Sequence, residues 1–317
     1  MATYEKVVVV TKQTALEELV ERFNTRAQAR FYLEHMGASF TDYQEAHDAY
    51  QRSLAQVRAA IPGGVRSQFI ERAFLPNFTF GPDDLVVTLG PDGLVVNSAK
   101  YLSDQPLLAF NPDVRRVDGI LVPFRAEQAC AALHNALRGE FACKRISMAK
   151  ASLNDGQTLY GFNDLFLGQR THLSARYRLS LGGQAEDQSS SGIIVSTGAG
   201  STGWYRSILA GAVSMVEGLL EAEDRAAIQA IREKYRFDWE ADYLRYSVRE
   251  PFVSKTSSAQ LVLGRIESGE CLEVVSAMPQ NGVIFSDGIE EDYLPFNSGV
   301  IARIGVAEKR VNLIVRL

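Results

Sequence analysis

Residues 6–10 form an unbroken run, KVVVV, in which every position after the lysine is a β-branched valine. β-Branched side chains favour extended strands, and a strand that is apolar throughout is stable only where both faces of its sheet are covered. Sheets of that kind are built from parallel strands that are joined by helices. The run therefore predicts a central strand of a helix-covered parallel sheet.

Helices and strands alternate after this run. Thr14 and Glu17 have the spacing of a capping box, which predicts a helix directly after the first strand. The expected elements that follow are a helix over 42–60, strands over 67–74 and 84–89, and a helix over 94–102. This alternation predicts a Rossmann-like α/β domain over residues 1–143.

The second half of the chain has a different pattern. Residues 172–181 alternate apolar and polar side chains, beginning with Leu173 on the apolar face, and end at the turn sequence Gly182-Gly183. Further short strands are expected over 192–196, 259–263, 272–277, 283–285, 300–306 and 311–315. We therefore expect a β-rich domain over 144–299 with a helical insertion near 214–245, and C-terminal strands over 300–317 that return to the first domain.

Length and composition exclude several classes of protein. A chain of 317 residues fits two domains better than a single core. The net charge of −5 offers no basic excess for nucleic acid, and no apolar run approaches the ~20 residues of a membrane span. Three cysteines without CxxC spacing and four scattered histidines predict reduced thiols and no resident metal site. We expect a cytoplasmic protein without a nucleic-acid or membrane partner.

The turn Gly90-Pro91-Asp92-Gly93 stands between an expected strand and an expected helix. Such a turn presents backbone N–H groups and the positive end of the helix to a phosphate. A carboxylate in the turn is poorly suited to bind phosphate but well suited to accept a proton from a hydroxyl group. Because Pro-Asp-Gly is also a common turn sequence, an ordinary turn remains an alternative.

Two further segments carry polar groups that could bind a ligand. In the segment SSSGIIVSTGAGSTGW, residues 189–204, three glycines interleave with small hydroxyl groups directly after an expected strand, which lets the backbone come close to a ligand. A flexible surface loop is the alternative. Asn163 and Asp164 lie in the apolar run YGFNDLFLG, where unpaired polar groups are costly to bury. They could bind a ligand or pair with the backbone.

In this order, the three segments resemble the motifs of the NAD kinase family. Its marks are a GGDG loop, an Asn-Glu or Asn-Asp pair, and a segment similar to STPTGSTAY. Shorter stretches also match: AFNPD around Asn111, REP at 249–251 and FSDG at 285–288. The sequence is most similar to the divergent, mitochondrial-type branch, and the resemblance extends from Val7 to the C-terminus. It implies a kinase with an α/β domain and a β-rich domain that forms homodimers or homotetramers.

The resemblance also implies roles for single residues. Asp92 would deprotonate the adenosine 2′-hydroxyl of NAD as this oxygen attacks the γ-phosphorus of ATP, with Mg²⁺ offsetting the phosphate charge. Residues expected to bind phosphate are Gly90, Gly93, Lys100 and Asn111, although Lys100 could equally be an exposed surface lysine. Residues expected to bind NAD are Gly93, Asn163, Asp164, Thr202, Gly203, Trp204 and Ser207.

Two departures from the family pattern keep other functions open. Pro91 replaces a glycine and removes an N–H group, while Leu94 stands where a small polar residue is frequent. Losing one charge-assisted hydrogen bond costs roughly 1.5–3 kcal/mol. One alternative is therefore a catalytically silent protein that senses NAD(P). Another is a lipid-type kinase that shares the GGDG-like loop, although the sequence lacks a basic amphipathic helix suited to a membrane surface.

Overall fold

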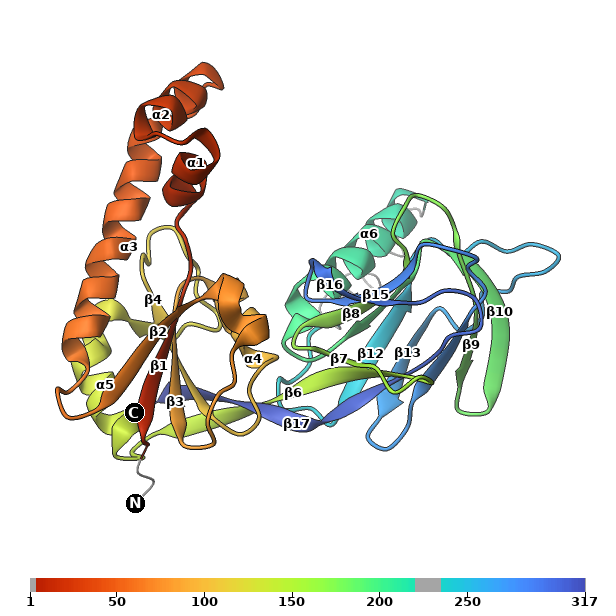
Figure 1. Cartoon of the computed structure of the whole chain (residues 1–317). Helices are drawn as coiled ribbons and strands as arrows, with labels where there is room; N and C mark the ends of the chain where they lie inside the picture. Colours follow the sequence, from red (N-terminus) through yellow and green to blue (C-terminus); the bar gives the residue numbers. More distant parts are fainter. Residues whose placement is uncertain (1–3, 220–234, 317) are drawn as a thin grey trace. The chain divides into compact units, whose positions relative to one another are not determined.

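The computed structural model describes residues 4–219 and 235–316 and divides into two compact units (Figure 1). The first unit comprises Met1–Lys144 and Val311–Leu317, and the second comprises Arg145–Arg310. The sequence placed these divisions near residues 143 and 299. The later division falls at 310 because one strand, β17 (Ile301–Arg316), begins in the second unit and ends in the first.

The first unit contains a parallel sheet with β1 (Lys6–Thr11) at its centre. β1 lies between β2 (Arg66–Glu71) and β3 (Asp84–Leu89), and β3 is followed in the sheet by β4 (Pro106–Asn111). The end of β17 pairs in parallel with β4 through Asn312 and Leu313. All four valines of β1 are fully buried, so the prediction from the KVVVV run is confirmed.

Helices cover both faces of this sheet. The helices that do so are α3 (Phe40–Ala60), α4 (Asp92–Ala99) and α5 (Ala129–Leu137), whereas α1 (Ala15–Phe23) and α2 (Arg26–His35) pack against each other and the end of α3 (Figure 1). α3 and α5 contribute Val57 and Leu133 to one core cluster with the strands, and Figure 1 shows α4 on the opposite face. The predicted capping box starts α1: Thr14 N–H donates to Glu17 Oε2 (2.7 Å) and Glu17 N–H to Thr14 Oγ1 (3.3 Å).

Two elements of this unit differ from the sequence prediction. The strand expected over 67–74 ends at Glu71, and a 3₁₀ helix, η1 (Arg72–Asn77), replaces its second half. Pro76 lies inside η1, and proline has no N–H group with which to continue a sheet ladder. The helix expected over 94–102 begins at Asp92, because Pro91 takes the N-cap position with extended dihedral angles, and it ends at Ala99.

The second unit packs two largely antiparallel sheets around a shared core. One has the strand order β13-β12-β11-β8-β15-β16. Side chains from both sheets, among them Leu165, Ile193, Leu179 and Val274, form this core. The first sheet comprises β8 (Asp164–Gln169), β11 (Ile193–Ser196), β12 (Tyr243–Val248), β13 (Leu263–Glu267), β15 (Gly282–Ser286) and β16 (Ile289–Pro295). The other contains β6 (Ala142–Leu153), β7 (Thr158–Gly161), β9 (Ala175–Leu181), β10 (Gln184–Ser190), β14 (Leu272–Ser276) and β17. The two-part fold class predicted from the sequence is confirmed.

The hairpin of β9 and β10 was predicted correctly, since Gly182 and Gly183 form its turn with positive φ angles of 57° and 79°. Leu173 was wrongly placed on the buried face: the strand begins only at Ala175, and Leu173 is 61% exposed. The strand expected over 259–263 is also wrong, because β13 begins at Leu263. The strands expected over 300–306 and 311–315 form the single strand β17.

The helical insertion also needs correction. Helix α6 (Trp204–Leu219) begins ten residues before the expected start at 214. Strand β12 occupies Tyr243–Val248, where the end of the insertion was expected, and residues 220–234 lie outside the described part of the chain. Among the described residues, no helix is both long and apolar enough to cross a bilayer.

Candidate functional site

The Gly90–Gly93 turn connects the fully buried strand β3 to α4 in the first unit. Gly90 N–H donates to the carbonyl oxygen of Phe110 on β4 (3.1 Å). A Cβ atom at Gly90 would lie 2.8 Å from Leu94 Cδ2, so a larger residue here would force this buried leucine to shift. A Cβ at Gly93 would meet no atom within 4 Å. Gly93 is exposed, and its backbone is therefore open to approach by a ligand.

Asp92 is the first residue of α4 and is half-buried. Its Oδ1 accepts a hydrogen bond from the N–H of Leu121 at 2.6 Å. Its Oδ2 accepts no hydrogen bond from any described residue. Near Asp92, the first N–H groups of α4 have no partner within the helix, so this end of the helix favours an anion. The turn thus holds one oriented carboxylate beside free N–H groups.

Two residues outside the turn support it, one on a strand and one on a helix. Asn111, at the end of β4, accepts from Asp113 N–H (2.9 Å) and donates from Nδ2 to the carbonyl oxygen of Val117 (3.0 Å). It thereby shapes the loop that delivers Leu121 to Asp92. Asn111 is only 6% exposed, so its amide serves this loop, and its expected contact with phosphate stays a prediction.

Tyr50 of α3 supports the turn in a similar way. Its hydroxyl donates to the carbonyl oxygen of Leu89, directly before Gly90, at 3.3 Å. It also accepts from Lys12 N–H, directly after β1, at 3.0 Å. Burial raises the pKa of the Tyr50 phenol to about 12, so the hydroxyl keeps its proton at neutral pH. Tyr50 therefore ties together the ends of β1 and β3.

Lys100 lies elsewhere than the sequence suggested. It is the C-cap residue of α4, an eight-residue helix about 12 Å long, so the whole helix separates it from the Gly90–Gly93 turn. It is also only 9% exposed, so the alternative of an exposed surface lysine is wrong. This position does not favour a role as a phosphate ligand of the turn, and we do not assign it one.

In the second unit, Asn163 and Asp164 stand at the break between β7 and β8 rather than within one strand. Asp287, in the turn between β15 and β16, holds this break. Its Oδ1 accepts from the N–H groups of Asn163 (2.7 Å) and Asp164 (3.2 Å), and its Oδ2 accepts from Phe162 N–H (3.0 Å). The side-chain amide of half-buried Asn163 makes no hydrogen bond to any described residue and is available to a ligand.

The loop after β11 packs against that break. Thr197 donates its hydroxyl to the carbonyl oxygen of Phe162 (2.6 Å), and its N–H to that of Asn163 (2.9 Å). A Cβ at Gly200 would fall well inside van der Waals contact of the Asn163 carbonyl, and one at Gly198 would overlap Asp238. These two glycines let two parts of the chain pack closely against each other. The sequence suggested instead that they let a ligand approach the backbone.

The remaining predicted residues of this loop are accessible. Thr202 is half-buried, while Gly203 and Ser207 are exposed. Ser207 Oγ donates to the carbonyl oxygen of Gly203 at 3.3 Å, within the first turn of α6. Together with Trp204, these residues form one continuous stretch at the start of α6 that can contact a ligand.

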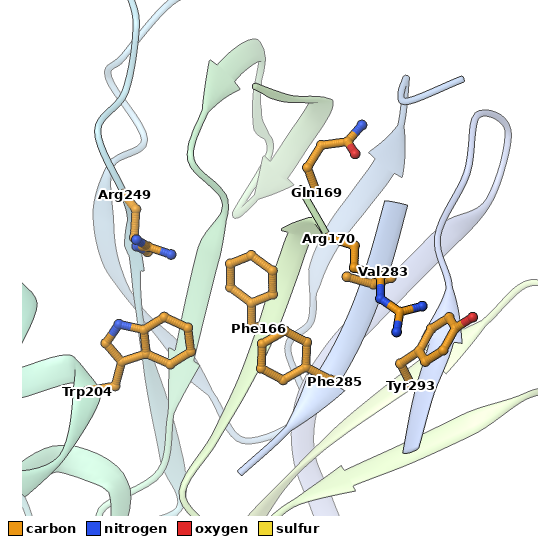
Figure 2. Close-up of a pocket in the computed structure, with 8 residues that line it drawn as sticks. All are labelled: Phe166, Gln169, Arg170, Trp204, Arg249, Val283, Phe285 and Tyr293. Carbon is orange, nitrogen blue, oxygen red and sulfur yellow. The ribbon is translucent and has the colours of Figure 1, made fainter. Parts of the chain in front are cut away.

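Trp204 forms one wall of an aromatic pocket of about 180 Å³ (Figure 2). Its ring stacks on Phe166 of β8, with centroids 5.7 Å apart and planes 12° apart, and lies 6.4 Å from Phe285 of β15. Phe166 and Phe285 lie 4.8 Å apart. Stacked aromatic surfaces of this kind bind planar rings of a ligand.

Two arginines flank the aromatic surface. The guanidinium of Arg249 lies 5.2 Å from the Trp204 centroid, and that of Arg170 lies 5.1 Å from the Tyr293 centroid (Figure 2). Arg170 has no ion-pair partner in the described part of the chain, and Arg249 has only a distant one, Glu250 at 3.9 Å. Weakly compensated guanidinium groups bind phosphate through paired hydrogen bonds. The pocket thus suits a planar ring joined to an anion.

Sequence reasoning found Trp204 but missed most of its surroundings. The missed residues include Phe166 on β8, Arg170 directly after β8, and Tyr293 on β16. No local sequence motif connects these three positions. One signal was present: β8 is apolar at successive positions, so both of its faces must be covered. Leu165 and Leu167 enter the core between the sheets, which leaves Phe166 to the opposite face.

The known proteins that are similar in sequence to this chain are NAD kinases. No family model matches the chain. Human mitochondrial NAD kinase 2 is 24% identical over 80% of this chain and 72% of its own length, and the rat protein is 23% identical over 80% and 75%. Over most of its length the chain is similar to these NAD kinases. The resemblance drawn from the three motifs is thereby confirmed.

Two solved structures share the fold of this chain. Yeast NADH kinase in complex with NADH superimposes with a TM-score of 0.60 at 14% identity, over 98% of this chain and 84% of the yeast chain. An NAD kinase from Archaeoglobus fulgidus in complex with ATP gives a TM-score of 0.56 at 15% identity, over 98% and 93%. The cytoplasmic location and the homodimer or homotetramer expected from the sequence stay predictions.

Proposed function

We propose that the chain is an NAD kinase that transfers the γ-phosphoryl group of ATP to the adenosine 2′-hydroxyl of NAD. The observation that carries this proposal is the arrangement of Asp92. A single backbone hydrogen bond orients its carboxylate, and Oδ2 stays open, at the carboxyl end of a parallel sheet where ligands of α/β proteins bind. The names of the relatives supply the reaction class in which such a base is needed.

The proposed step is an in-line displacement. The Asp92 carboxylate accepts the proton of the 2′-hydroxyl as its oxygen forms a bond to the γ-phosphorus. The bond from that phosphorus to the β,γ-bridging oxygen breaks, and ADP leaves with the electron pair. Free N–H groups at Asp92 and Gly93 face the negative charge that moves onto the phosphate oxygens. A base of this kind contributes roughly 10²–10⁴-fold in rate.

In this proposal, NAD contacts the second unit. One of its planar rings stacks on Trp204, and its diphosphate meets Arg249 and Arg170. The amide of Asn163, which Asp287 positions through the backbone, hydrogen-bonds a ribose hydroxyl. Thr202, Gly203 and Ser207, which lie beside Trp204 at the start of α6, are proposed to contact the same NAD molecule.

Mg²⁺ belongs to the proposed reaction as part of the donor. In the described residues, no three His, Cys, Asp or Glu side chains come together in a way that could hold a metal ion. We therefore assign Mg²⁺ to the phosphates of ATP, whose charge it neutralises, and not to a site formed by protein ligands.

Pro91 gives one observation in favour of the silent-sensor alternative. As the N-cap of α4 it has no N–H group to offer a phosphate, although its φ of −74° fits the turn without distortion. The lipid-type kinase has no comparable support in the structure. Pro91 therefore predicts a slow kinase, and a protein that binds NAD without turning it over is the competing outcome.

The test is NADP formation by the purified chain from NAD and MgATP, detected with an NADP-specific dehydrogenase. The kinase proposal predicts turnover, and Trp204→Ala is expected to raise the KM for NAD about tenfold, since ring stacking contributes roughly 1–3 kcal/mol. Phe252→Ala, at an exposed aromatic residue outside the pocket, serves as the control. Calorimetric NAD binding without turnover, with ATP, GTP or polyphosphate as donor, would instead establish the sensor.

A further inference from the structure

Four residues other than glycine have a positive φ angle in the part of the chain that the structure describes: Asn24, Glu250, Asn281 and Asp287. Such angles are uncommon outside glycine, because the Cβ atom then crowds the neighbouring peptide groups. Asn24 is the C-cap of α1, where a left-handed residue is ordinary. The other three lie in the second unit, next to residues proposed to bind NAD. Irregular backbone that gathers around one site indicates a constraint imposed by function.

Two of these three positions are turns that suit their residues. Asp287 fixes the break at Asn163 through its carboxylate, and the carbonyl oxygen of Asn281 accepts from Arg170 N–H at 2.9 Å. Asparagine and aspartate adopt positive φ angles at a lower cost than other side chains. Glu250, with a φ of 40°, has no such tolerance, and the proline that follows it restricts its backbone further. Glu250 is therefore the strained position of the three.

The chain is anchored on both sides of Glu250. Before it, Arg249 N–H donates to the carbonyl oxygen of Gly192 (2.8 Å), and the carbonyl oxygen of Arg249 accepts from Ser191 N–H (2.9 Å). After it, Phe252 N–H donates to a carbonyl oxygen of β10 (2.8 Å). The chain thus passes from the segment between β10 and β11 onto β10 itself, and Glu250 takes up this change of direction with its positive φ angle.

These anchors decide where the Arg249 side chain lies. Gly192, its backbone partner, has no room for a side chain, since a Cβ atom there would lie 2.6 Å from Phe166 Cε2. The backbone of Arg249 is therefore paired with a segment that packs directly on the Phe166 ring, and its guanidinium lies 5.2 Å from the Trp204 centroid (Figure 2). The Glu250 carboxylate contributes little to this placement, because its side chain is 70% exposed and 3.9 Å from the guanidinium.

We propose that Glu250 is a positioning residue for NAD: its left-handed backbone, and not its carboxylate, sets the Arg249 guanidinium over Trp204 to meet the NAD diphosphate. This inference rests on the proposed function and deepens it. A guanidinium that is fixed before the ligand arrives loses less side-chain entropy on binding. The backbone at Glu250 should therefore set the affinity for NAD and leave the rate of the chemical step unchanged.

The test measures kcat, the KM for NAD and, by calorimetry, the Kd for NAD. Glu250→Val introduces a β-branched side chain that scarcely adopts positive φ, so KM and Kd are expected to rise about tenfold with kcat unchanged. Glu250→Asn and Glu250→Gly, which accept positive φ, and Glu250→Gln, which removes only the charge, should keep the wild-type values. Asn24→Val is the matched control: it should lower Tm as Glu250→Val does and leave both NAD constants unchanged.

A double-mutant cycle shows whether Glu250 acts through Arg249. Arg249→Met is expected to raise the Kd for NAD about tenfold or more, since it removes charge-assisted hydrogen bonds to the diphosphate. Adding Glu250→Val to Arg249→Met should raise the Kd no further. Three results would overturn the inference: effects that multiply in the double variant, an unchanged Kd in Glu250→Val, or a loss in Glu250→Gln equal to that in Glu250→Val.

The same measurements separate this inference from the kinase proposal. NADP formation with a normal KM for NAD in Glu250→Val would refute the positioning role and leave the kinase standing. A chain that binds NAD without making NADP, and loses this binding in Glu250→Val but not in Asn24→Val, would do the reverse. A chain that does not bind NAD would refute both.

Discussion

Gly93 follows β3 in the first unit, and Gly200 follows β11 in the second, each in a segment that the sequence marks as ligand-binding. Around Gly93 a Cβ atom would meet nothing within 4 Å, whereas at Gly200 it would overlap the carbonyl of Asn163. The first segment leaves its backbone open, and the second uses its glycines to pack against the chain. A glycine-rich loop can therefore indicate either approach by a ligand or approach by the protein itself, and only the three-dimensional contacts distinguish the two.

The aspartates of the two regions also differ: one carboxylate is occupied by the backbone, and the other keeps an oxygen available to a ligand. Asp287 accepts three backbone N–H groups and fixes the break before β8, while Asp92 accepts one and keeps an oxygen open. One aspartate is structural and supports a binding residue, and the other is placed for chemistry. Substitutions at the four positions, compared in pairs, test this division.

The largest effect is expected for Gly200→Ala. The added methyl group overlaps a backbone carbonyl that cannot rotate away, so we expect the free energy of unfolding to fall by at least about 3 kcal/mol in urea denaturation. Gly211→Ala in α6, where a Cβ has open space, is the control and should be neutral or slightly stabilising. A Gly200→Ala protein as stable as the wild type would contradict the conclusion that Gly200 is needed for close packing against Asn163.

The next effect separates the two aspartates. Asp287→Asn removes the charge that holds three N–H groups, and a loss of roughly 1.5–3 kcal/mol is expected. Asp92→Asn should change the unfolding free energy by less than about 1 kcal/mol, because the asparagine amide oxygen can still accept from the Leu121 N–H and only the charge is lost. Asp292→Asn, at an exposed position of β16, controls for charge removal. Equal losses at 287 and 92 would contradict the division between structural and chemical roles.

Alkaline pH should loosen the support of the Gly90–Gly93 turn. Burial raises the pKa of Tyr50 from 10.0 to about 12. Below pH 10 the phenol is protonated in both states; between about 10 and 12 only the unfolded chain loses the proton, so stability falls as pH rises. Tyr50 should account for about 2–3 kcal/mol of this fall. Tyr50→Phe should flatten the slope of unfolding free energy over this range, as measured by urea denaturation at a series of pH values.

The smallest effect on stability is expected at Gly93. Gly93→Ala adds a better helix former in open space, so the protein should be unchanged or more stable by up to about 1 kcal/mol. The same methyl group stands where the phosphates of the donor approach, so the KM for ATP should rise several-fold in steady-state kinetics. A destabilised Gly93→Ala protein with normal kinetics would show that both segments use their glycines alike.

The sequence predicts the first unit well for a physical reason. A strand such as β1, apolar on both faces, and a capping box such as Thr14 with Glu17 are local patterns, and they fix the sheet and the first helix. β12 shows the opposite case: residues 243–248, YLRYSV, carry Arg245 on a half-exposed face, and the expected helical insertion was extended over them. Pairing with β11 on one side and β13 on the other, not the local sequence pattern, makes this segment a strand.

The site was predictable only where its residues lie in motifs. Asp92, Asn163 and Trp204 stand in short recognisable segments, and the structure places each on an accessible surface. Phe166, Arg170 and Tyr293 join Trp204 only because β8, β15 and β16 are neighbours in one sheet. The structural role of Asp287 depends on a turn far away in the sequence, so no spacing rule reveals it.

The central claim is that Asp92 is the base of a kinase reaction and contributes little to the stability of the fold. The most direct measurement compares kcat for NADP formation and the Kd for NAD in the wild type and in Asp92→Asn. We predict that kcat falls about 10²–10⁴-fold while the Kd for NAD and the unfolding midpoint stay the same. An Asp92→Asn protein that forms NADP at the wild-type rate would contradict the account.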